Sequence, residues 1–313
     1  MSFIQTSNGS RLLKSKSLVQ PLLDGALDIV GDVHGEMDAL LSLMHHLGYN
    51  DNGSHPDRRR LVFVGDLTDR GPDSPAVCEL IERLVGTQRA QCVLGNHDLN
   101  LLLGHRKHDN GWFYGEPFLE DAQLVPQVLA NDLIRQQVLG FFQTLPIALE
   151  RTDIKVVHAH WDTHMIAVAR NSSDAVELYN EHHHLIEDRF PGLDLDVADK
   201  VLQHQNRNPV KLLTSGPEMR TEEPVHASGK VRYAKRVPWW KDCRGDFVVF
   251  GHYSILDGNP RGGASAFCVD YGIGKRWTER RAGKSEDFSL KLAAFRWPER
   301  IVVFDEGSRQ ALR

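Results

Sequence analysis

The stretch IVGDVHGEMDAL, residues 29–40, places glycine, aspartate and histidine between an apolar run and a helix-like pattern. The arrangement recurs along the chain, because short runs of valine, isoleucine, leucine and phenylalanine are each followed by a polar cluster. These runs are LDIV (27–30), LVFV (61–64), QCVL (91–94), IKVV (154–157) and FVVF (247–250), followed by GDVHG, GDLTDRGPDS, GNHD, HAHWD and GHY. Continuous apolar runs of this length predict strands that are buried on both faces of a sheet.

Helical patterns follow the first two polar clusters. Apolar residues recur at helical spacing from Met37 to Leu47 and from Val77 to Leu84, so strand, polar loop and helix form a repeated unit of an α/β fold. Later runs at 265–270, 288–297 and 301–304 are typical of strands, and the last two predict an antiparallel finish to the sheet.

Two less regular stretches, about 104–144 and 165–240, are rich in histidine, asparagine, proline and charge. We interpret them as insertions into a single domain that spans residues 1–313, and we expect them to shape the substrate face. The run RRR at 58–60 predicts an exposed entry to a strand, and VPWW at 237–240 predicts packing of an insertion onto the core.

Composition sets the class of protein. The chain has 313 residues, of which 41% are hydrophobic and 25% charged, and its net charge of −5 gives no electrostatic reason to expect a nucleic acid or a membrane as partner. No stretch approaches the roughly 18 apolar residues of a membrane span, and residues 1–24 hold no apolar core of signal-peptide length. The four cysteines form no CxxC pair, so we expect reduced thiols and a cytoplasmic location.

The polar clusters supply the ligand types of a metal site. They contain two carboxylates, one amide and three imidazoles, from Asp32, His34, Asp66, Asn96, His158 and His252. Functional groups of open α/β sheets gather beyond the carboxyl ends of the strands. A mixed oxygen and nitrogen set suits Mn, Fe, Zn or Co, and six ligands spread over five strand ends fit two open-sided ions better than one closed zinc site. Two such ions can hold the attacking and leaving oxygens of a phosphoryl transfer.

The spacing of Asp32 and His34 predicts an extended step that points both side chains to one side. Gly31 and Gly35 beside them permit a sharp exit from the strand. Taken singly, GDVHG could be a turn and GNHD a helix-capping loop. The ordered conjunction of all five clusters favours a metal site over these readings.

The ordered motifs GDVHG, GDLTDRG, GNHD, VVH and GH resemble the calcineurin-like metallophosphoesterases, over about 26–160 and 245–275. GDLTDRGPDS and VLGNHDLNLLLG are similar to stretches of bacterial serine/threonine phosphatases and of symmetric diadenosine tetraphosphate hydrolases. GHYS carries no second histidine, which favours the phosphoprotein phosphatase branch of the family. The resemblance implies a four-layer α/β/β/α sandwich with mixed sheets and helical insertions.

The resemblance also implies roles for the residues that match its motifs. Asp32, His34 and a bridging Asp66 would hold one ion, and Asp66, Asn96, His158 and His252 the other. Hydroxide held between the ions would attack phosphorus. His97 would be the general acid, oriented by Asp69, and a carboxylate partner raises the pKa of a histidine as that role requires. Arg70 would clamp the phosphate, together with Asn96. Mn²⁺ is the expected metal, with Fe, Zn or Co as alternatives.

Some roles stay open from the sequence. A second phosphate-binding arginine is usual in the family, and Arg207, Arg220 and Arg236 are the candidates. His160 is either a ligand or a packed side chain, and the run HHH at 182–184 predicts a solvated polar patch rather than a metal site.

The substrate also stays open. A phosphoprotein or small phosphomonoester comes first, because Asp69 is present beside the general acid. A dinucleoside polyphosphate cleaved symmetrically comes second, and a terminally phosphorylated nucleic acid third. A catalytically silent binding protein is the rival from another class, but such a protein would not need the pair His97 and Asp69.

Overall fold

The computed structural model describes residues 17–227 and 230–312, so most of the amino-terminal segment considered for a signal peptide lies outside the described residues. Two six-stranded sheets form the centre of the fold. In spatial order, the first sheet consists of β16 (Arg309–Ala311), β15 (Ile301–Phe304), β14 (Ala293–Trp297), β2 (Leu27–Val30), β3 (Arg60–Phe63) and β4 (Ala90–Cys92). β2, β3 and β4 are parallel, whereas β14, β15 and β16 pair antiparallel. The predicted antiparallel finish is therefore confirmed.

The second sheet is also mixed. In spatial order, it consists of β1 (Val19–Pro21), β7 (Ala148–Glu150), β8 (Ile154–Val157), β11 (Phe247–Phe250), β13 (Ala266–Cys268) and β12 (Gly262–Gly263). β8, β11 and β13 are parallel, and β7 and β12 pair antiparallel with their neighbours β8 and β13. All five apolar runs of the sequence thus become strands, three in the first sheet and two in the second.

Aromatic side chains join the two sheets face to face. The ring of Phe247 on β11 stacks on Phe295 and Trp297 of β14, with centroids 5.7 Å and 5.4 Å apart, and Phe267 of β13 lies 5.1 Å from Phe295. Every residue of β2 and of β11 is buried, as expected of strands with no solvent-facing side.

Helices pack on the outer sides of both sheets. α1 (Met37–Leu47) contacts β15, α2 (Ser74–Gly86) contacts β4, and α5 (Thr163–Arg170) contacts β1. α1 ends at Gly48, whose φ of 100° is a left-handed conformation that glycine adopts without strain. α2 begins after Asp73, whose carboxylate accepts a 3.0 Å hydrogen bond from the backbone N–H of Ala76. The expected α/β sandwich of mixed sheets is confirmed.

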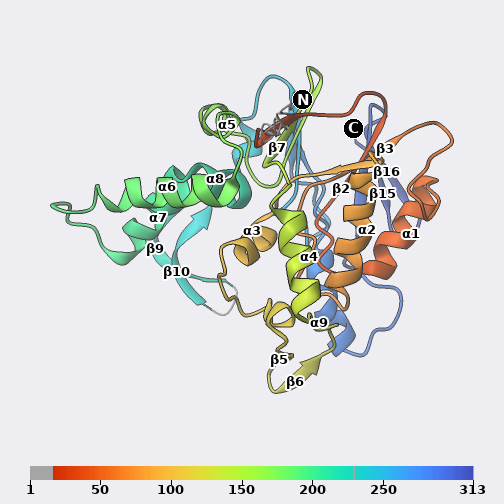
Figure 1. Cartoon of the computed structure of the whole chain (residues 1–313), viewed down its shortest axis with the longest axis horizontal. Coiled ribbons are helices and arrows are strands. Elements are labelled where there is room, and N and C mark those ends of the chain that lie inside the picture. The colour runs from red at the N-terminus through yellow and green to blue at the C-terminus, as the bar shows by residue number, and fades with distance from the viewer. Residues whose placement is uncertain (1–16, 228–229, 313) are drawn as a thin grey trace, which may run out of the picture.

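The two stretches interpreted as insertions form compact structures at the edge of the sandwich. The first, 104–144, contains η1 (Gly111–Tyr114), the hairpin β5 (Phe118–Glu120) and β6 (Gln123–Val125), and α4 (Asp132–Phe142). Beyond α5, the second contains α6 (Ala175–Glu187), α7 (Val197–Arg207), α8 (Pro209–Ser215), β9 (Glu218–Ala227), β10 (Lys230–Arg236) and η2 (Trp239–Lys241). α6, α7 and α8 contact one another, and the long β9–β10 hairpin packs on α7 at the left of Figure 1. The description as one domain with two insertions stays a prediction.

The tryptophans of η2 attach this second insertion to the core. Trp239 and Trp240 are buried, and their rings lie 4.7 Å and 5.6 Å from that of Phe250 on β11. Packing of the VPWW stretch onto the core is therefore confirmed. Within the described residues, no helix combines the length and apolar character needed to cross a membrane.

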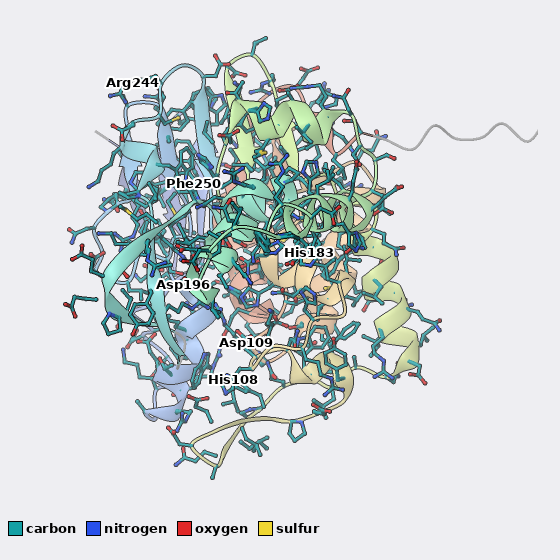
Figure 2. The ribbon with its side chains drawn as sticks, turned by 90° about the vertical axis from the view of Figure 1, so that its left-hand side faces the viewer. His108, Asp109, His183, Asp196, Arg244 and Phe250 are labelled. Atoms are coloured by element: carbon teal, nitrogen blue, oxygen red, sulfur yellow. The ribbon has the colours of Figure 1, made fainter. Side chains whose placement is uncertain are left out.

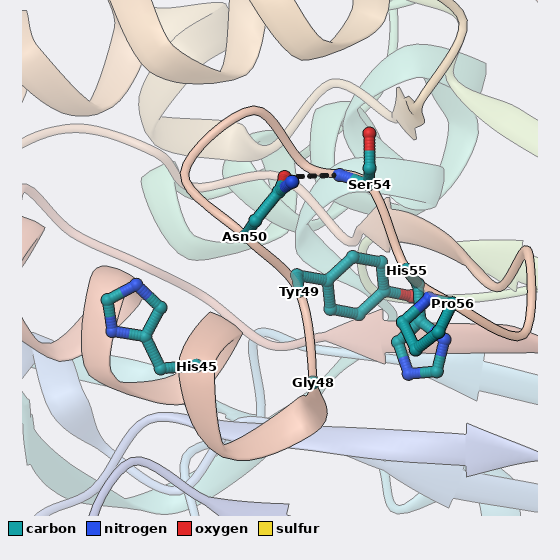
Figure 3. Close-up of a pocket in the computed structure, with 7 residues that line it drawn as sticks. All are labelled: His45, Gly48, Tyr49, Asn50, Ser54, His55 and Pro56. Atoms are coloured by element: carbon teal, nitrogen blue, oxygen red, sulfur yellow. Dashed lines mark hydrogen bonds between the residues drawn. The ribbon is translucent and has the colours of Figure 1, made fainter.

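A buried ion cluster lies near the start of β2. The Asp28 carboxylate is fully buried and accepts hydrogen bonds from Arg59 (2.9 Å), Arg296 (2.8 Å) and the Tyr49 hydroxyl (2.8 Å). The prediction that residues 58–60 are exposed is wrong for Arg59, because Asp28 compensates its charge inside the protein. Tyr49 also lines a surface hollow with His45, Asn50, Ser54 and His55 (Figure 3).

Candidate metal centre

Polar residues that follow five strands come together where the two sheets end. Asp32 follows β2, Asp66 follows β3, and Asn96 opens α3 (Asn96–Leu102) shortly after β4, all from the first sheet. His158 follows β8 and His252 follows β11, both from the second sheet. The carboxyl ends of parallel strands thus supply the site, as the sequence predicts.

Asp66 is the residue that these groups share. Ligand atoms of His34, Asp66 and His97 lie within 4.8 Å of one another, and so do those of Asp66, His158 and His252. Oδ2 of Asp66 lies 3.3 Å from Nε2 of His158 and 3.8 Å from Nε2 of His34. A carboxylate shared by two groups of potential ligands fits the bridging role expected of Asp66, although the first group contains His97, which the resemblance gives as the acid.

Backbone carbonyls fix the orientation of two imidazoles. Nδ1 of His34 donates to the carbonyl of Thr68 at 2.8 Å, and Nδ1 of His158 donates to the carbonyl of Val64 at 2.7 Å. Each ring therefore turns its Nε2 toward Asp66.

Asn96 stands beside the histidines of the second sheet. Its Oδ1 lies 2.7 Å from Nδ1 of His252 and 3.2 Å from Nε2 of His158. The amide oxygen thus joins the predicted ligands Asp66, His158 and His252 in one cluster.

Asp32 reaches the second sheet through the backbone. Its carboxylate oxygens accept the N–H of His252 at 3.1 Å and 3.2 Å. A Cβ added at Gly251 would lie 2.0 Å from Oδ1 of Asp32, so only glycine leaves room for this approach. The predicted extended step from Asp32 to His34 is wrong, because His34 lies in a turn with φ of 47°.

Positive backbone φ angles concentrate at the site. The non-glycine residues concerned are His34 (47°), Asp66 (50°), Asp69 (74°), Arg70 (68°) and His252 (65°). Such conformations cost of order 1–3 kcal/mol each and persist where the surrounding structure enforces them, often at functional sites.

The charge states of the cluster fit divalent cations. Although burial opposes it, the imidazoles of His158 and His97 hold the pKa of Asp66 well below its usual range. Burial and the neighbouring Asp270 raise the pKa of Asp32, so a cation is needed to ionise it fully. Burial, followed by the charge of a nearby arginine, lowers the pKa of both His34 and His252, which favours the neutral imidazole that metals bind. His158 differs: burial lowers its pKa, but the carboxylates of Asp66 and Asp32 outweigh burial and raise that pKa to about 10, so a cation would have to displace its proton. With that proton displaced, carboxylates, an amide and imidazoles around a shared Asp66 are a donor set that fits two such ions.

A proton donor lies beside this cluster. Nδ1 of His97 is 2.6 Å from Oδ2 of Asp69, and the other oxygen of Asp69 accepts a 2.7 Å hydrogen bond from the indole N–H of Trp112. Burial lowers the pKa of His97, but the carboxylates of Asp66, Asp109 and Asp69 outweigh it and raise that pKa to about 9. His97 is therefore favoured as an imidazolium near neutral pH, the form that a general acid needs.

Arg70 connects the acid with the predicted metal ligands. Its Nη1 and Nη2 lie 3.1 Å and 2.9 Å from Nε2 of His34 and of His97. Its Nε donates at 2.8 Å to Asp109 of the first insertion, which Figure 2 labels. The guanidinium thus occupies the Nε2 atoms of both His34 and His97, and while Arg70 donates to Nε2 of His97, that ring holds its proton on Nδ1.

Asp98 connects two backbone segments of the site. Its carboxylate accepts the backbone N–H groups of Asp66 (2.9 Å), Leu67 (3.0 Å) and Gly95 (3.1 Å). These bonds hold the loop after β3 against the start of α3, where Asp66 and Asn96 originate.

Of the three candidate arginines, Arg236 lies at the site. Its Nη1 donates to the carbonyl of His252 at 3.0 Å, and its charge contributes to the lowered pKa of that histidine. Arg220 instead pairs with Asp196 and Asp199 at the start of α7. Arg207 is exposed and lines a hollow with Phe190 and Leu193, away from the polar strand ends.

His160 packs rather than joining a group of ligands. Its ring lies 4.8 Å from that of Trp239, and burial lowers its pKa to about 4. Among the residues that the structure describes, it belongs to none of the groups of potential metal ligands.

Sequence reasoning missed Asp109 and Trp112, which the first insertion brings to Arg70 and Asp69. Each lies about 40 residues along the chain from its partner, in an irregular stretch without a motif. It also missed Gly274, where an added Cβ would lie 2.2 Å from the ring of His34.

Comparison with known proteins matches residues 26–254 to the model of the calcineurin-like phosphoesterases. The asymmetrical bis(5'-nucleosyl)-tetraphosphatase PrpE of Oceanobacillus iheyensis is 27% identical over 91% of this chain and 93% of that protein. The protein of the same name from Geobacillus thermodenitrificans is 47% identical over 43% of this chain and 56% of its own length.

Solved structures share the fold at low sequence identity. A putative diadenosine tetraphosphatase superposes with a TM-score of 0.50 at 20% identity and covers 93% of this chain and 97% of its own. A cold-active protein-tyrosine phosphatase of a Shewanella species superposes with a TM-score of 0.52 at 17% identity, over 94% of this chain and 83% of its own.

Proposed function

Since this chain belongs to the calcineurin-like phosphoesterase family and is a metal-dependent phosphoric ester hydrolase, we propose that it hydrolyses phosphomonoesters of alcohols, in phosphoproteins or small molecules. The pair of His97 and Asp69 beside the shared carboxylate of Asp66 carries this proposal. An alkoxide leaving group is strongly basic and needs a proton in the transition state, whereas a nucleotide leaving from an anhydride does not. A buried proton donor with its own orienting carboxylate therefore favours esters of alcohols.

In this proposal the polar strand ends hold two divalent ions, with Mn²⁺ expected first. Asp32, His34 and Asp66 would hold one ion, and Asp66, Asn96, His158 and His252 the other. Bound there, two such ions would supply Lewis-acid chemistry at the phosphoryl group and lower the pKa of a water molecule toward neutrality.

The chain's own residues then bind the phosphate and move the proton. Arg70 turns from the Nε2 atoms of His34 and His97 to the phosphate oxygens, which its planar fork can grip in bidentate fashion. Asn96 and Arg236 contact the same phosphate from the side of the second sheet. The turn of Arg70 uncovers Nε2 of His97, which takes up a proton from water because the pKa of this ring is raised to about 9. Nε2 then donates that proton to the leaving oxygen while Asp69 accepts from Nδ1.

A dinucleoside polyphosphate is the second candidate substrate, and the names of the relatives favour it. Those names specify asymmetrical cleavage, whereas the sequence resemblance pointed to symmetric cleavage. We also propose a cytoplasmic location, supported by the four free cysteines, of which Cys78, Cys92 and Cys268 are buried.

The test is a substrate panel with Mn²⁺-loaded protein and Asp66→Asn as the inactive control. The panel holds a phosphoserine peptide, p-nitrophenyl phosphate, diadenosine tetraphosphate and a 3'-phosphorylated oligonucleotide, with products resolved by mass. Preferred release of orthophosphate from the peptide supports the proposal. Preferred formation of AMP and ATP, or of two ADP, supports the second candidate instead. If the wild-type protein hydrolyses none of these compounds, both candidate activities are refuted, and the alternative of a catalytically silent binding protein is favoured.

A further inference from the structure

The second insertion carries a group of potential metal ligands separate from the polar strand ends. His183 and Glu187 lie one turn apart on α6, and His204 lies on the neighbouring α7. Their ligand atoms are within 4.8 Å of one another. We call these three residues the helix-pair cluster; Figure 2 labels His183, on the side of the molecule that faces the viewer.

The side chains of the helix-pair cluster are already gathered. Nε2 of His204 lies 2.6 Å from Oε1 of Glu187. The rings of His183 and His204 lie 4.4 Å apart, with 23° between their planes. Because residues four apart on a helix share a face, α6 presents His183 and Glu187 together to α7.

Two ring nitrogens of this cluster lack the partners that buried polar atoms require. Nδ1 of His183 and Nδ1 of His204 are both shielded from solvent and have no hydrogen-bond partner within residues 17–227 and 230–312. A buried polar atom left unsatisfied costs about 1–3 kcal/mol. A ligand that accepts the lone pair of a neutral imidazole nitrogen, such as a cation, would remove this cost.

The environment keeps at least one imidazole in its ligating form. Burial and the neighbouring His204 lower the pKa of His183, so its neutral ring offers a lone pair near neutral pH. Two aromatic rings pack beside the cluster: the Tyr179 ring lies 6.1 Å from that of His183, and the Phe190 ring lies 5.5 Å from that of His204. The Glu187 side chain is 50% exposed, which leaves one side open to solvent.

The sequence predicts a solvated polar patch for the run at 182–184, and this reading still suits the exposed His184. It does not account for His183, whose ring stacks on His204 of a different helix and whose Nδ1 is buried and unpaired.

We propose that His183, Glu187 and His204 bind one zinc ion that links α6 to α7. Two imidazoles and one carboxylate are a common zinc ligand set, with a fourth position left to water. A link between two helices far apart in sequence would stiffen the insertion, because metal binding stabilises the fold that assembles its ligands. This site is independent of the proposed phosphatase function.

The experiment measures zinc bound per chain at increasing free zinc, by equilibrium dialysis and elemental analysis. Wild-type protein is compared with His204→Ala, with Glu187→Gln and with the matched control His184→Ala from the same histidine run. We expect His204→Ala and Glu187→Gln to bind this zinc ion at least about tenfold more weakly than wild type. At a free zinc concentration that just saturates wild type, each variant should therefore hold roughly one zinc ion fewer per chain. The control should bind as much zinc as wild type, and Mn²⁺-dependent hydrolysis should be unchanged in all variants.

Glu187→Gln keeps the test decisive if His204→Ala fails to fold, because residue 187 is half exposed and the substitution conserves its size. Equal zinc content and affinity in wild type and Glu187→Gln would overturn the proposal. An equal loss in His184→Ala would do so as well, because it would assign the zinc to the surface run rather than to the helix-pair cluster.

Discussion

Replacing Trp112 by phenylalanine removes a hydrogen-bond donor from the proton-transfer pair while leaving His97 and Asp69 in place. The indole N–H donates at 2.7 Å to Oδ1 of Asp69, and both side chains are fully buried. A hydrogen bond to a charged group contributes about 1.5–3 kcal/mol, and no water can reach this carboxylate oxygen to replace it. We therefore expect Trp112→Phe to loosen the carboxylate that orients His97.

The size of the effect follows from that energy. If the orientation is needed only in the transition state, a loss of about 1.5–3 kcal/mol lowers kcat by roughly 10- to 150-fold. The deficit should appear with a phosphoserine peptide, whose alkoxide leaving group needs the proton of His97. It should be much smaller with p-nitrophenyl phosphate, whose leaving group does not.

The assay compares kcat for the two substrates in wild type, in Trp112→Phe and in the control Trp240→Phe. Trp240 is buried against Phe250, so the control loses the same atoms without touching Asp69. Thermal melts and manganese content accompany the kinetics, so that unfolding or metal loss is recognised. An equal fall of kcat for both substrates in Trp112→Phe, with full metal content, would refute the role given to the Trp112–Asp69–His97 chain.

Other predictions concern the metals, the acid and the core. Asp66→Asn should lose at least one ion by elemental analysis and nearly all turnover, and full metal content at a normal rate would contradict the shared position of this carboxylate. His97→Ala should keep its metals and turn over slowly, chiefly for alkyl esters; an equal deficit for nitrophenyl esters would argue against an acid. Gly251→Ala, which puts a methyl 2.0 Å from a carboxylate oxygen of the metal cluster, should destabilise the fold by about 1–3 kcal/mol and reduce metal content. Gly86→Ala is the control, because a Cβ added at Gly86 has no neighbour within 4 Å. Equal urea midpoints for Gly251→Ala and Gly86→Ala would contradict the steric argument. Asp28→Ala should lower the free energy of unfolding by about 3–5 kcal/mol without changing metal content, because it leaves the charges of Arg59 and Arg296 without their buried carboxylate partner. An unchanged urea midpoint would show that the ion cluster contributes little to stability.

The sequence predicts the frame of the site because that frame depends on local patterns. Apolar runs such as 27–30 and 247–250 are buried on both faces, and polar residues that follow parallel strands gather at one end of the sheets. Of the predicted ligands, His34, His158 and His252 therefore lie around Asp66 although they are spread over more than 200 residues, and Asn96 lies beside the two histidines of the second sheet. Asp32 belongs to neither group and contacts the backbone N–H of His252 instead.

What the sequence could not predict depends on contacts without a local signature. No motif or spacing in the sequence indicates that Asp109 pairs with Arg70, or that Arg236 contacts His252 whereas Arg220 pairs with Asp196. The turn at His34 escaped prediction for a related reason. A positive φ in a non-glycine residue is enforced by surrounding packing and not by its own preference.

Pattern reasoning failed similarly for buried charge. Arg59 lies in a run of three arginines that resembles a solvated surface, yet Asp28 draws it into the core. His183 and His204 are 21 positions apart, so their stacking becomes visible only once α6 lies against α7.

The hydrogen bond between Arg70 and Asp109 bears on how the enzyme recovers after each turnover. Orthophosphate is the product of every phosphomonoester, and an arginine that gripped it without competition would retain it. Asp109 lies 2.8 Å from the same guanidinium and is held there by the fold, so it competes with any bound phosphate for Arg70. If Arg70 grips the phosphate as we propose, this carboxylate would draw Arg70 back after each turnover, and we expect inhibition by orthophosphate to be weak.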